Sequence, residues 1–206
     1  MNFRKLIIPL QALFLVFAGG IVTATAQVQD TTSLQLQPEF TLTINGTSNV
    51  RDWDANVETV NADFRVVGIT GVAPQDLDPG HFHSLGFRIP VEDIDSGNRR
   101  LTNNIQDYLK GDDHPTITFT LSDITAVEQN EEGTFLQATG VLNAAGGQTT
   151  LNTDVKVVRT GNGTLLFSGS HTIKMTDVGI SPPTVLLGTI RAADEVTITW
   201  SLPFGS

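Results

Sequence analysis

The chain has 206 residues, with 12 Lys and Arg residues against 22 Asp and Glu residues, and it has no cysteine. Without cysteine it has neither a disulfide framework nor a lipid-accepting cysteine behind a leader. Its formal net charge is −10. An acidic surface repels nucleic-acid backbones and anionic lipid headgroups, so the composition argues against nucleic acid or a peripheral membrane surface as a partner.

Residues 1–26 have the pattern of a secretory signal peptide. Two basic residues precede an apolar run over residues 6–18, and small residues at 24–26 fit cleavage before Gln27. The apolar run is interrupted and shorter than the ~20 residues that a membrane-spanning helix needs, and no later stretch comes closer. We therefore expect a periplasmic or secreted protein with no integral membrane segment after cleavage. Cleavage removes two basic residues and makes the net charge −12.

The rest of the chain is dominated by the alternation typical of β-strands. Residues 27–37 are polar and predict a short spacer, so a single domain is expected over residues 38–206. In that domain, apolar and polar residues alternate in roughly seven or eight segments. Gly-containing turns at 131–133, 146–147 and 161–163 join neighbouring strands as antiparallel hairpins. Such strands form a two-sheet sandwich or close into a barrel, and periodicity alone does not decide between the two.

One segment, over residues 98–110, follows a helical period instead. Asn98 is a suitable N-cap, and Gly111 lies just past the expected end. The sequence therefore predicts one amphipathic helix. Its apolar face comprises Leu101, Ile105, Tyr108 and Leu109.

The stretch GTSNVRDWDANV, residues 46–57, places a Trp between two Asp residues. Strand alternation turns Trp53 inward and sends Asp52 and Asp54 to the opposite face. We expect Arg51 and its Asp neighbours to face water. A catalytic dyad needs both carboxylates to converge on one substrate atom, so this pair is not one. Trp53 is then either a core residue or a residue in contact with a bound ligand.

Three histidines are candidate metal ligands. His81 and His83 are ~6.6 Å apart along an extended strand, a spacing that suits two imidazoles on one metal. His171 is a third candidate from another strand, and the alternative is that all three are polar residues of a barrel mouth or of the surface. The sequence has no Gly-rich phosphate loop, no nucleophile elbow and no cysteine nucleophile, so we expect no enzymatic activity.

Four segments of the chain form a recognisable series: FTLTINGTSNVRDWDANV (40–57), IDSGNRRLTNNIQDYLKGDDHPTITFTL (94–121), GVLNAAGGQTTLNTDVKV (140–157) and MTDVGISPPTVLLGTIRAADEVTITW (175–200). The most specific pieces are HPTITF, which follows the predicted helix, and MTDVGISPP, which precedes the last strand and either only crosses the barrel end or forms a lid. In this order the four segments resemble the YceI-like lipid- and polyisoprenoid-binding family, in the version common among Bacteroidota. The resemblance implies an all-β fold, a lipocalin-like eight-stranded antiparallel β-barrel with one amphipathic helix packed across it.

The resemblance also implies an exported binding protein whose partner is a long-chain apolar small molecule, such as an isoprenoid quinone, a polyisoprenoid or a fatty-acid-like amphiphile. Its work would be transport, storage or sequestration, and no cofactor is expected other than such a bound isoprenoid or acyl lipid. Two alternatives stay open: a secreted structural or stress-related β protein with a filled core, and a metal-binding protein using His81 and His83. The expected tunnel wall comprises Trp53, Phe87, Ile89, Ile105, Leu109, Phe119, Leu121, Phe167, Ile173, Met175 and Trp200.

Overall fold

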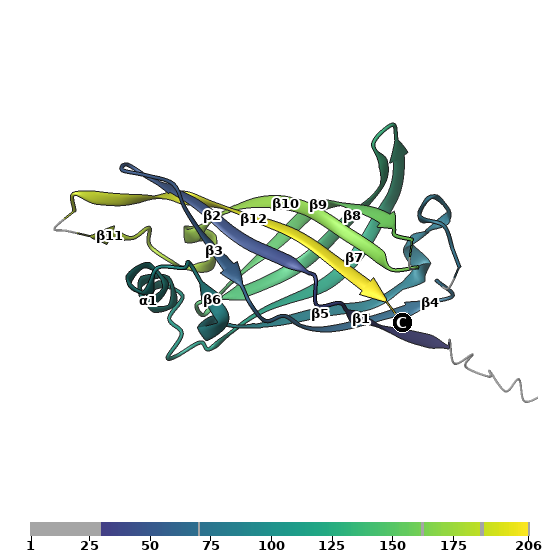
Figure 1. The fold of residues 1–206 in the computed structure, drawn as a ribbon, viewed down its shortest axis with the longest axis horizontal. Helices are drawn as coiled ribbons and strands as arrows, with labels where there is room; N and C mark the ends of the chain where they lie inside the picture. Colours follow the sequence, from purple (N-terminus) through teal and green to yellow (C-terminus); the bar gives the residue numbers. More distant parts are fainter. Residues whose placement is uncertain (1–29, 70, 162, 186–187, 206) are drawn as a thin grey trace, which may run out of the picture.

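The computed structural model describes residues 30–205, except residues 70, 162 and 186–187 (Figure 1). The expected signal peptide lies outside the described residues. Among those described, no helix combines the length and the apolar character that crossing a bilayer requires.

Eight antiparallel strands close into a barrel, and this confirms the predicted fold class. Each strand pairs with the next, and the last pairs with the first, so the sheet has no free edge along this circuit (Figure 1). In spatial order the strands are β1 (Thr31–Leu36), β4 (Asn61–Val67), β5 (Phe82–Pro90), β7 (Thr116–Asn130), β8 (Gly133–Ala144), β9 (Gly147–Arg159), β10 (Leu165–Lys174) and β12 (Ile190–Gly205).

Shorter strands extend the barrel wall beside residues 192–201 of β12. They follow the order β12–β2–β3–β6, and one further strand pairs with the start of β12. The short strands are β2 (Thr41–Ser48), β3 (Trp53–Val57), β6 (Ile94–Asp95) and β11 (Thr184–Val185). Among the described residues, the connections also contain the 3-10 turns η1 (Pro74–Asp76), η2 (Pro79–His81), η3 (Val91–Asp93) and η4 (Met175–Val178).

Strand β1 corrects the prediction of a spacer over residues 27–37. Residues 31–36 pair with β4 on one side and with the end of β12 on the other, and they thereby close the barrel. Leu34 is buried beside Phe64, while the polar neighbours of Leu34 face outward. One buried side chain in a polar segment gives little periodic signal, which explains the error. The chain then breaks near Pro38, which has no N–H to donate to a ladder, and continues along the same edge of β12 as β2.

The predicted helix is confirmed as α1 (Arg99–Tyr108). Oδ1 of Asn98 accepts hydrogen bonds from the backbone N–H groups of Arg100 and Leu101, each at 3.1 Å. After the helix, Lys110 has φ 55°, and the N–H of Gly111 donates to the carbonyl of Gln106. The helix lies at one end of the barrel, far from the C-terminus (Figure 1). Its apolar face is therefore available to cover that opening.

Candidate functional site

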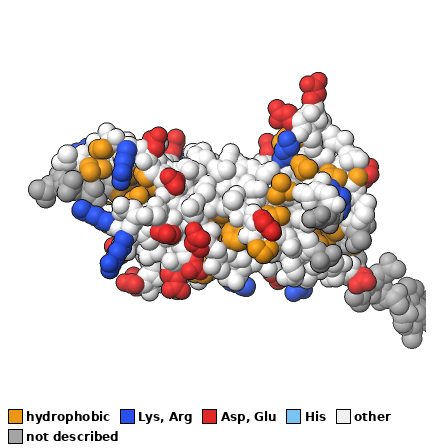
Figure 2. Space-filling model, viewed as in Figure 1, with side chains coloured by type: hydrophobic (Ala, Val, Ile, Leu, Met, Phe, Trp, Pro, Cys, Tyr) orange, Lys and Arg blue, Asp and Glu red, His pale blue; other side chains and the backbone are white. Residues whose placement is uncertain are grey.

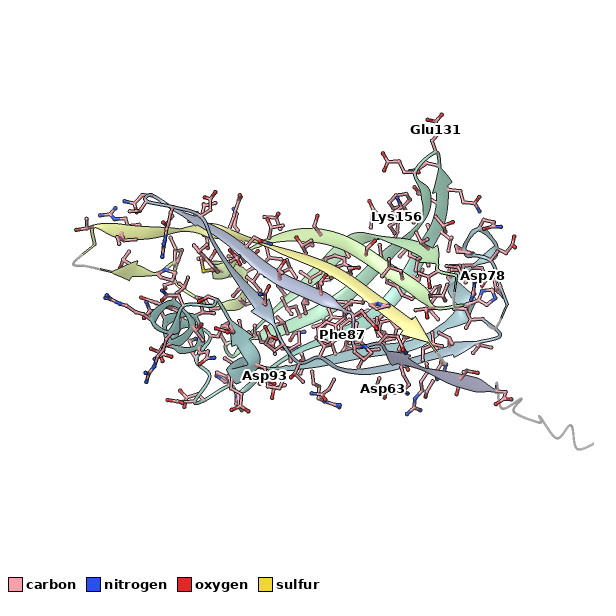
Figure 3. All side chains as sticks on the ribbon, viewed as in Figure 1. Asp63, Asp78, Phe87, Asp93, Glu131 and Lys156 are labelled. Atoms are coloured by element: carbon pink, nitrogen blue, oxygen red, sulfur yellow. The ribbon has the colours of Figure 1, made fainter. Side chains whose placement is uncertain are left out.

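A cavity of about 530 Å³ occupies the barrel interior, a size within the ~300–1,000 Å³ range of ligand pockets. Its wall is almost entirely apolar and includes side chains from both halves of the core. All eleven residues predicted for the tunnel wall line this cavity. Figure 3 shows one of them, Phe87, pointing into the barrel, whereas Asp63 and Glu131 lie on the outside. Contact of these residues with a ligand stays a prediction.

The large rings leave the cavity open because glycines face them across the sheet. A Cβ atom on Gly169 would lie 2.7 Å from Cζ2 of Trp200, closer than real side-chain contacts allow. The ring therefore occupies the space above the glycine instead of projecting across the barrel. The ring and glycine pairs are Trp53 with Gly46, Phe119 with Gly140 and Trp200 with Gly169.

A cluster of phenylalanines closes the end of the cavity opposite α1. The ring centroids of Phe64 and Phe204 are 5.0 Å apart, and those of Phe64 and Phe167 are 5.5 Å apart, both in edge-to-face geometry. Phe204 is only 2% exposed. Sequence reasoning missed Phe64 and Phe204 as wall residues. Phe204 continues the alternation that contains Trp200, so that signal was present.

Helix α1 covers the other end and is held there by polar contacts. Ile105 and Leu109 face the cavity, as predicted. The side-chain amide of Gln106 donates to the carbonyls of Glu92 at 3.0 Å and Ile94 at 3.2 Å. Nζ of Lys110 donates to the carbonyl of Ala145 at 3.0 Å. The C-terminal end of the helix and the turn after it are thus tied to the barrel rim.

The start of α1 is fixed by Asp95. The hydroxyl of Thr102 donates to Oδ1 of Asp95 at 2.7 Å, and the N–H of Gly97 donates to the same oxygen at 3.0 Å. These hydrogen bonds favour the ionised carboxylate, so they lower the pKa of Asp95 below its ordinary value, with Thr102 the larger cause. The carboxylate therefore anchors the loop before the helix in its charged form.

Residues of the β2–β3 turn and of the start of α1 both line the cavity, and we call this group of residues the mouth. Arg51 is exposed, as expected, but it also lines the cavity there. Asp52 and Asp54 are exposed and do not line the cavity, which confirms the alternation around Trp53. Sequence reasoning missed the rest of this group because their meeting depends on where the helix docks. The mouth comprises Ser48, Val50, Arg51, Asn98, Arg100, Leu101 and Asn104.

The segment after β10 also contributes to the wall. η4 begins at Met175, and Gly179 ends it in the left-handed conformation with φ 74°. Val178, Ile180 and Pro183 all line the cavity. The MTDVGISPP motif therefore crosses the barrel end and forms part of the enclosure.

The structure does not bring the three candidate metal ligands together. His81 lies in η2, where its Nδ1 accepts from the backbone N–H of Asp78 at 3.0 Å. His83 is exposed, because a bulge between β4 and β5 leaves it without a cross-strand partner and breaks its phase with Leu85. His171 lines the cavity. In the described part of the chain, no three His, Asp or Glu side chains are grouped closely enough to hold a metal ion.

Comparison with protein families decides the relationship that the sequence motifs indicated. Residues 43–204 match the model of the YceI-like domain. The chain belongs to the YceI-like family. Comparison with curated proteins finds no match.

Solved structures similar to this YceI-like protein have the same barrel. BcnA of Burkholderia cenocepacia has a TM-score of 0.62 at 20% identity, covering 82% of this chain and 99% of that one. A polyisoprenoid-binding domain of Saccharophagus degradans has a TM-score of 0.59 at 12% identity, covering 84% and 97%. The YceI protein of Campylobacter jejuni has a TM-score of 0.53 at 20% identity, covering 72% and 82%. At these identities the likeness shows the YceI-like fold alone.

Proposed function

We propose that this YceI-like protein is an exported, non-enzymatic binding protein that encloses one long apolar ligand. The ligand is an isoprenoid quinone, a polyisoprenoid or a fatty-acid-like amphiphile, which the protein transports, stores or sequesters. One observation carries the proposal: an apolar cavity of about 530 Å³ that ends in phenylalanines at one end and in polar groups at the other. That cavity argues against the alternative of a filled core.

The apolar wall supplies affinity without directional contacts. Burying a CH₂ group contributes about 0.8 kcal/mol, so a chain of a dozen carbons in contact with the wall offsets the entropic cost of binding. Such contacts discriminate poorly between one chain and another. Selection of a ligand class then falls to the polar groups at the mouth.

Two further observations support the proposal. A structurally similar protein from Saccharophagus degradans is described as a polyisoprenoid-binding domain. Export to a periplasm or to the medium is supported by the signal-peptide pattern of residues 1–26.

Ligand extraction tests the proposal. The protein is purified without detergent from its own host, examined by native mass spectrometry, and extracted with organic solvent. We expect an apolar lipid at close to one molecule per chain. A protein that emerges empty, and whose Trp fluorescence does not respond to added isoprenoids or fatty acids, is not a lipid carrier.

Replacing one of two alanines by phenylalanine tests whether the lipid occupies the cavity or another part of the protein. Ala138 lines the cavity on β8, whereas Ala126 on β7 does not line it. Ala138→Phe should reduce the amount of co-purified lipid, and Ala126→Phe should not. Circular dichroism establishes that both variants are folded before their lipid content is compared.

A further inference from the structure

The charged side chains that line the cavity are both positive. Arg51 and Arg100 line it, and no Asp or Glu does so within the described residues. The chain as a whole has 22 acidic residues against 12 basic ones. The mouth therefore has the opposite sign to the protein around it. Figure 2 shows Lys and Arg side chains at this end of the molecule.

Both arginines start from backbone positions that hydrogen bonds fix. Oγ of Ser48 accepts from the backbone N–H of Arg51 at 3.1 Å and donates to its carbonyl at 2.8 Å, which sets the β2–β3 turn. Arg100 is the second residue of α1, where Asn98 caps its N–H. The two arginines thus enter the cavity lining from separate elements, the β2–β3 turn and α1.

Neither guanidinium forms an ion pair with an Asp or Glu of the described residues. The ion pairs within the described residues join Arg65 to Asp63 and His81 to Asp78, and neither involves a mouth residue. The first turn of α1 contains Arg99 and Arg100 and no acidic residue. The helix macrodipole favours negative charge at this end, so this placement works against helix stability.

We propose that the mouth binds an anionic headgroup, a carboxylate or a phosphate monoester, of an amphiphile whose chain fills the cavity. Guanidinium groups match the planar oxygens of a carboxylate and the oxygens of a phosphate through paired hydrogen bonds. Asn104 adds a side-chain amide at the same end. The assignment rests on the proposed function and sharpens it: fatty-acid-like amphiphiles and phosphorylated isoprenoids are preferred over neutral quinones.

Two probes with the same chain and different heads test this assignment. Delipidated protein is titrated with palmitate and with hexadecanol, below their aggregation concentrations, and binding is followed by Trp fluorescence. We expect palmitate to bind at least about five-fold more tightly, the scale of a partly exposed charge interaction. The preference should shrink as salt is added.

Substitutions of arginines inside and outside the cavity lining then test which charges bind the headgroup. In the double variant Arg51→Gln with Arg100→Gln, the ratio of palmitate to hexadecanol affinity should fall towards one. Arg99→Gln, which removes a charge from the adjacent helix position outside the cavity lining, should keep the wild-type ratio.

Each outcome has a distinct meaning. Equal binding of the two probes by the wild type overturns the anionic-head assignment but leaves the apolar carrier intact. Failure of both probes to bind overturns the proposed function itself. Inorganic phosphate that binds the wild type by itself as tightly as palmitate, so that the chain adds nothing to affinity, would indicate a site for free anions, and the amphiphile assignment would then be wrong.

Discussion

At the scale of single residues, the cavity exists because large rings and glycines share the barrel wall. An indole or phenyl ring projecting inward from an eight-stranded barrel would fill much of its width. A cross-strand glycine gives the ring a place against the wall, so the apolar surface is kept while the volume stays free. Trp200 and Gly169, which are direct partners between β12 and β10, show this most clearly.

Gly169→Ala should therefore destabilise the protein and shrink the cavity. The new Cβ would meet Cζ2 of Trp200 at 2.7 Å and the backbone oxygen of Asp154 at 3.0 Å, so the ring must move inward. We expect a loss of about 1–3 kcal/mol in the free energy of unfolding, as for other overpacked cores, and weaker binding of long-chain probes.

Urea unfolding followed by circular dichroism measures the loss. Gly161→Ala is the matched control, because a Cβ there meets no atom within 4 Å. Equal unfolding midpoints for the Gly169 and Gly161 variants would show that the Trp200 ring tolerates a methyl group beneath it.

At the scale of elements, α1 covers one end of the barrel. It is too short to be stable by itself, so a few hydrogen bonds to the barrel hold it in place. The helix has 10 residues, and isolated helices shorter than ~12–15 residues are marginal in water. Gln106 ties its C-terminal end to the barrel rim, Lys110 ties the turn just past it, and Asp95 ties its start. The period and the caps predicted its bounds. The sequence could not predict which end of the barrel the helix covers, because its position there depends on hydrogen bonds to carbonyls of η3 and of the β8–β9 turn.

Thr102→Val should raise the pKa of Asp95 towards its ordinary value. The Thr102 hydroxyl is the larger cause of the lowered pKa, and valine keeps the shape of the side chain without the donor. A carboxyl with a lowered folded-state pKa stabilises the protein above its unfolded-state pKa, ~3.9, and this stabilisation disappears as the pH falls through the folded value. The variant should therefore lose stability at neutral pH and less on acidification.

The Asp95 carboxyl carbon reports its own titration by NMR, and hydrogen exchange over residues 99–108 reports the anchoring of the helix. Thr102→Ser retains the hydroxyl and should retain the low pKa. An unchanged titration in the valine variant would assign the effect to the N–H of Gly97, which also bonds this carboxylate.

At the scale of the whole molecule, most of the barrel could be predicted and the details of its closure could not. Alternation located the long strands, and family resemblance selected a barrel where periodicity left a sandwich open. Two local features were not predicted from the sequence. The bulge at His83 shifts the phase within one strand, and β1 has only Leu34 as a fully buried residue. Both depend on pairing with distant residues, which a local pattern does not contain.

Shortening the chain tests whether β1 is needed to close the barrel, because a domain that begins at residue 38 lacks this strand. Without residues 31–36, β4 and the end of β12 would both have unpaired edges. The space that the Leu34 side chain fills beside Phe64 would then be empty. Loss of a buried leucine side chain alone costs about 2–5 kcal/mol. A chain starting at Pro38 should therefore unfold at lower urea concentration than one starting at Asp30, and it should aggregate.

Leu34→Ala in the longer chain should reproduce part of this loss of stability, and Thr32→Ala, at an exposed position of the same strand, should reproduce little of it. Equal midpoints for the two chain lengths would mean that the barrel holds together without β1.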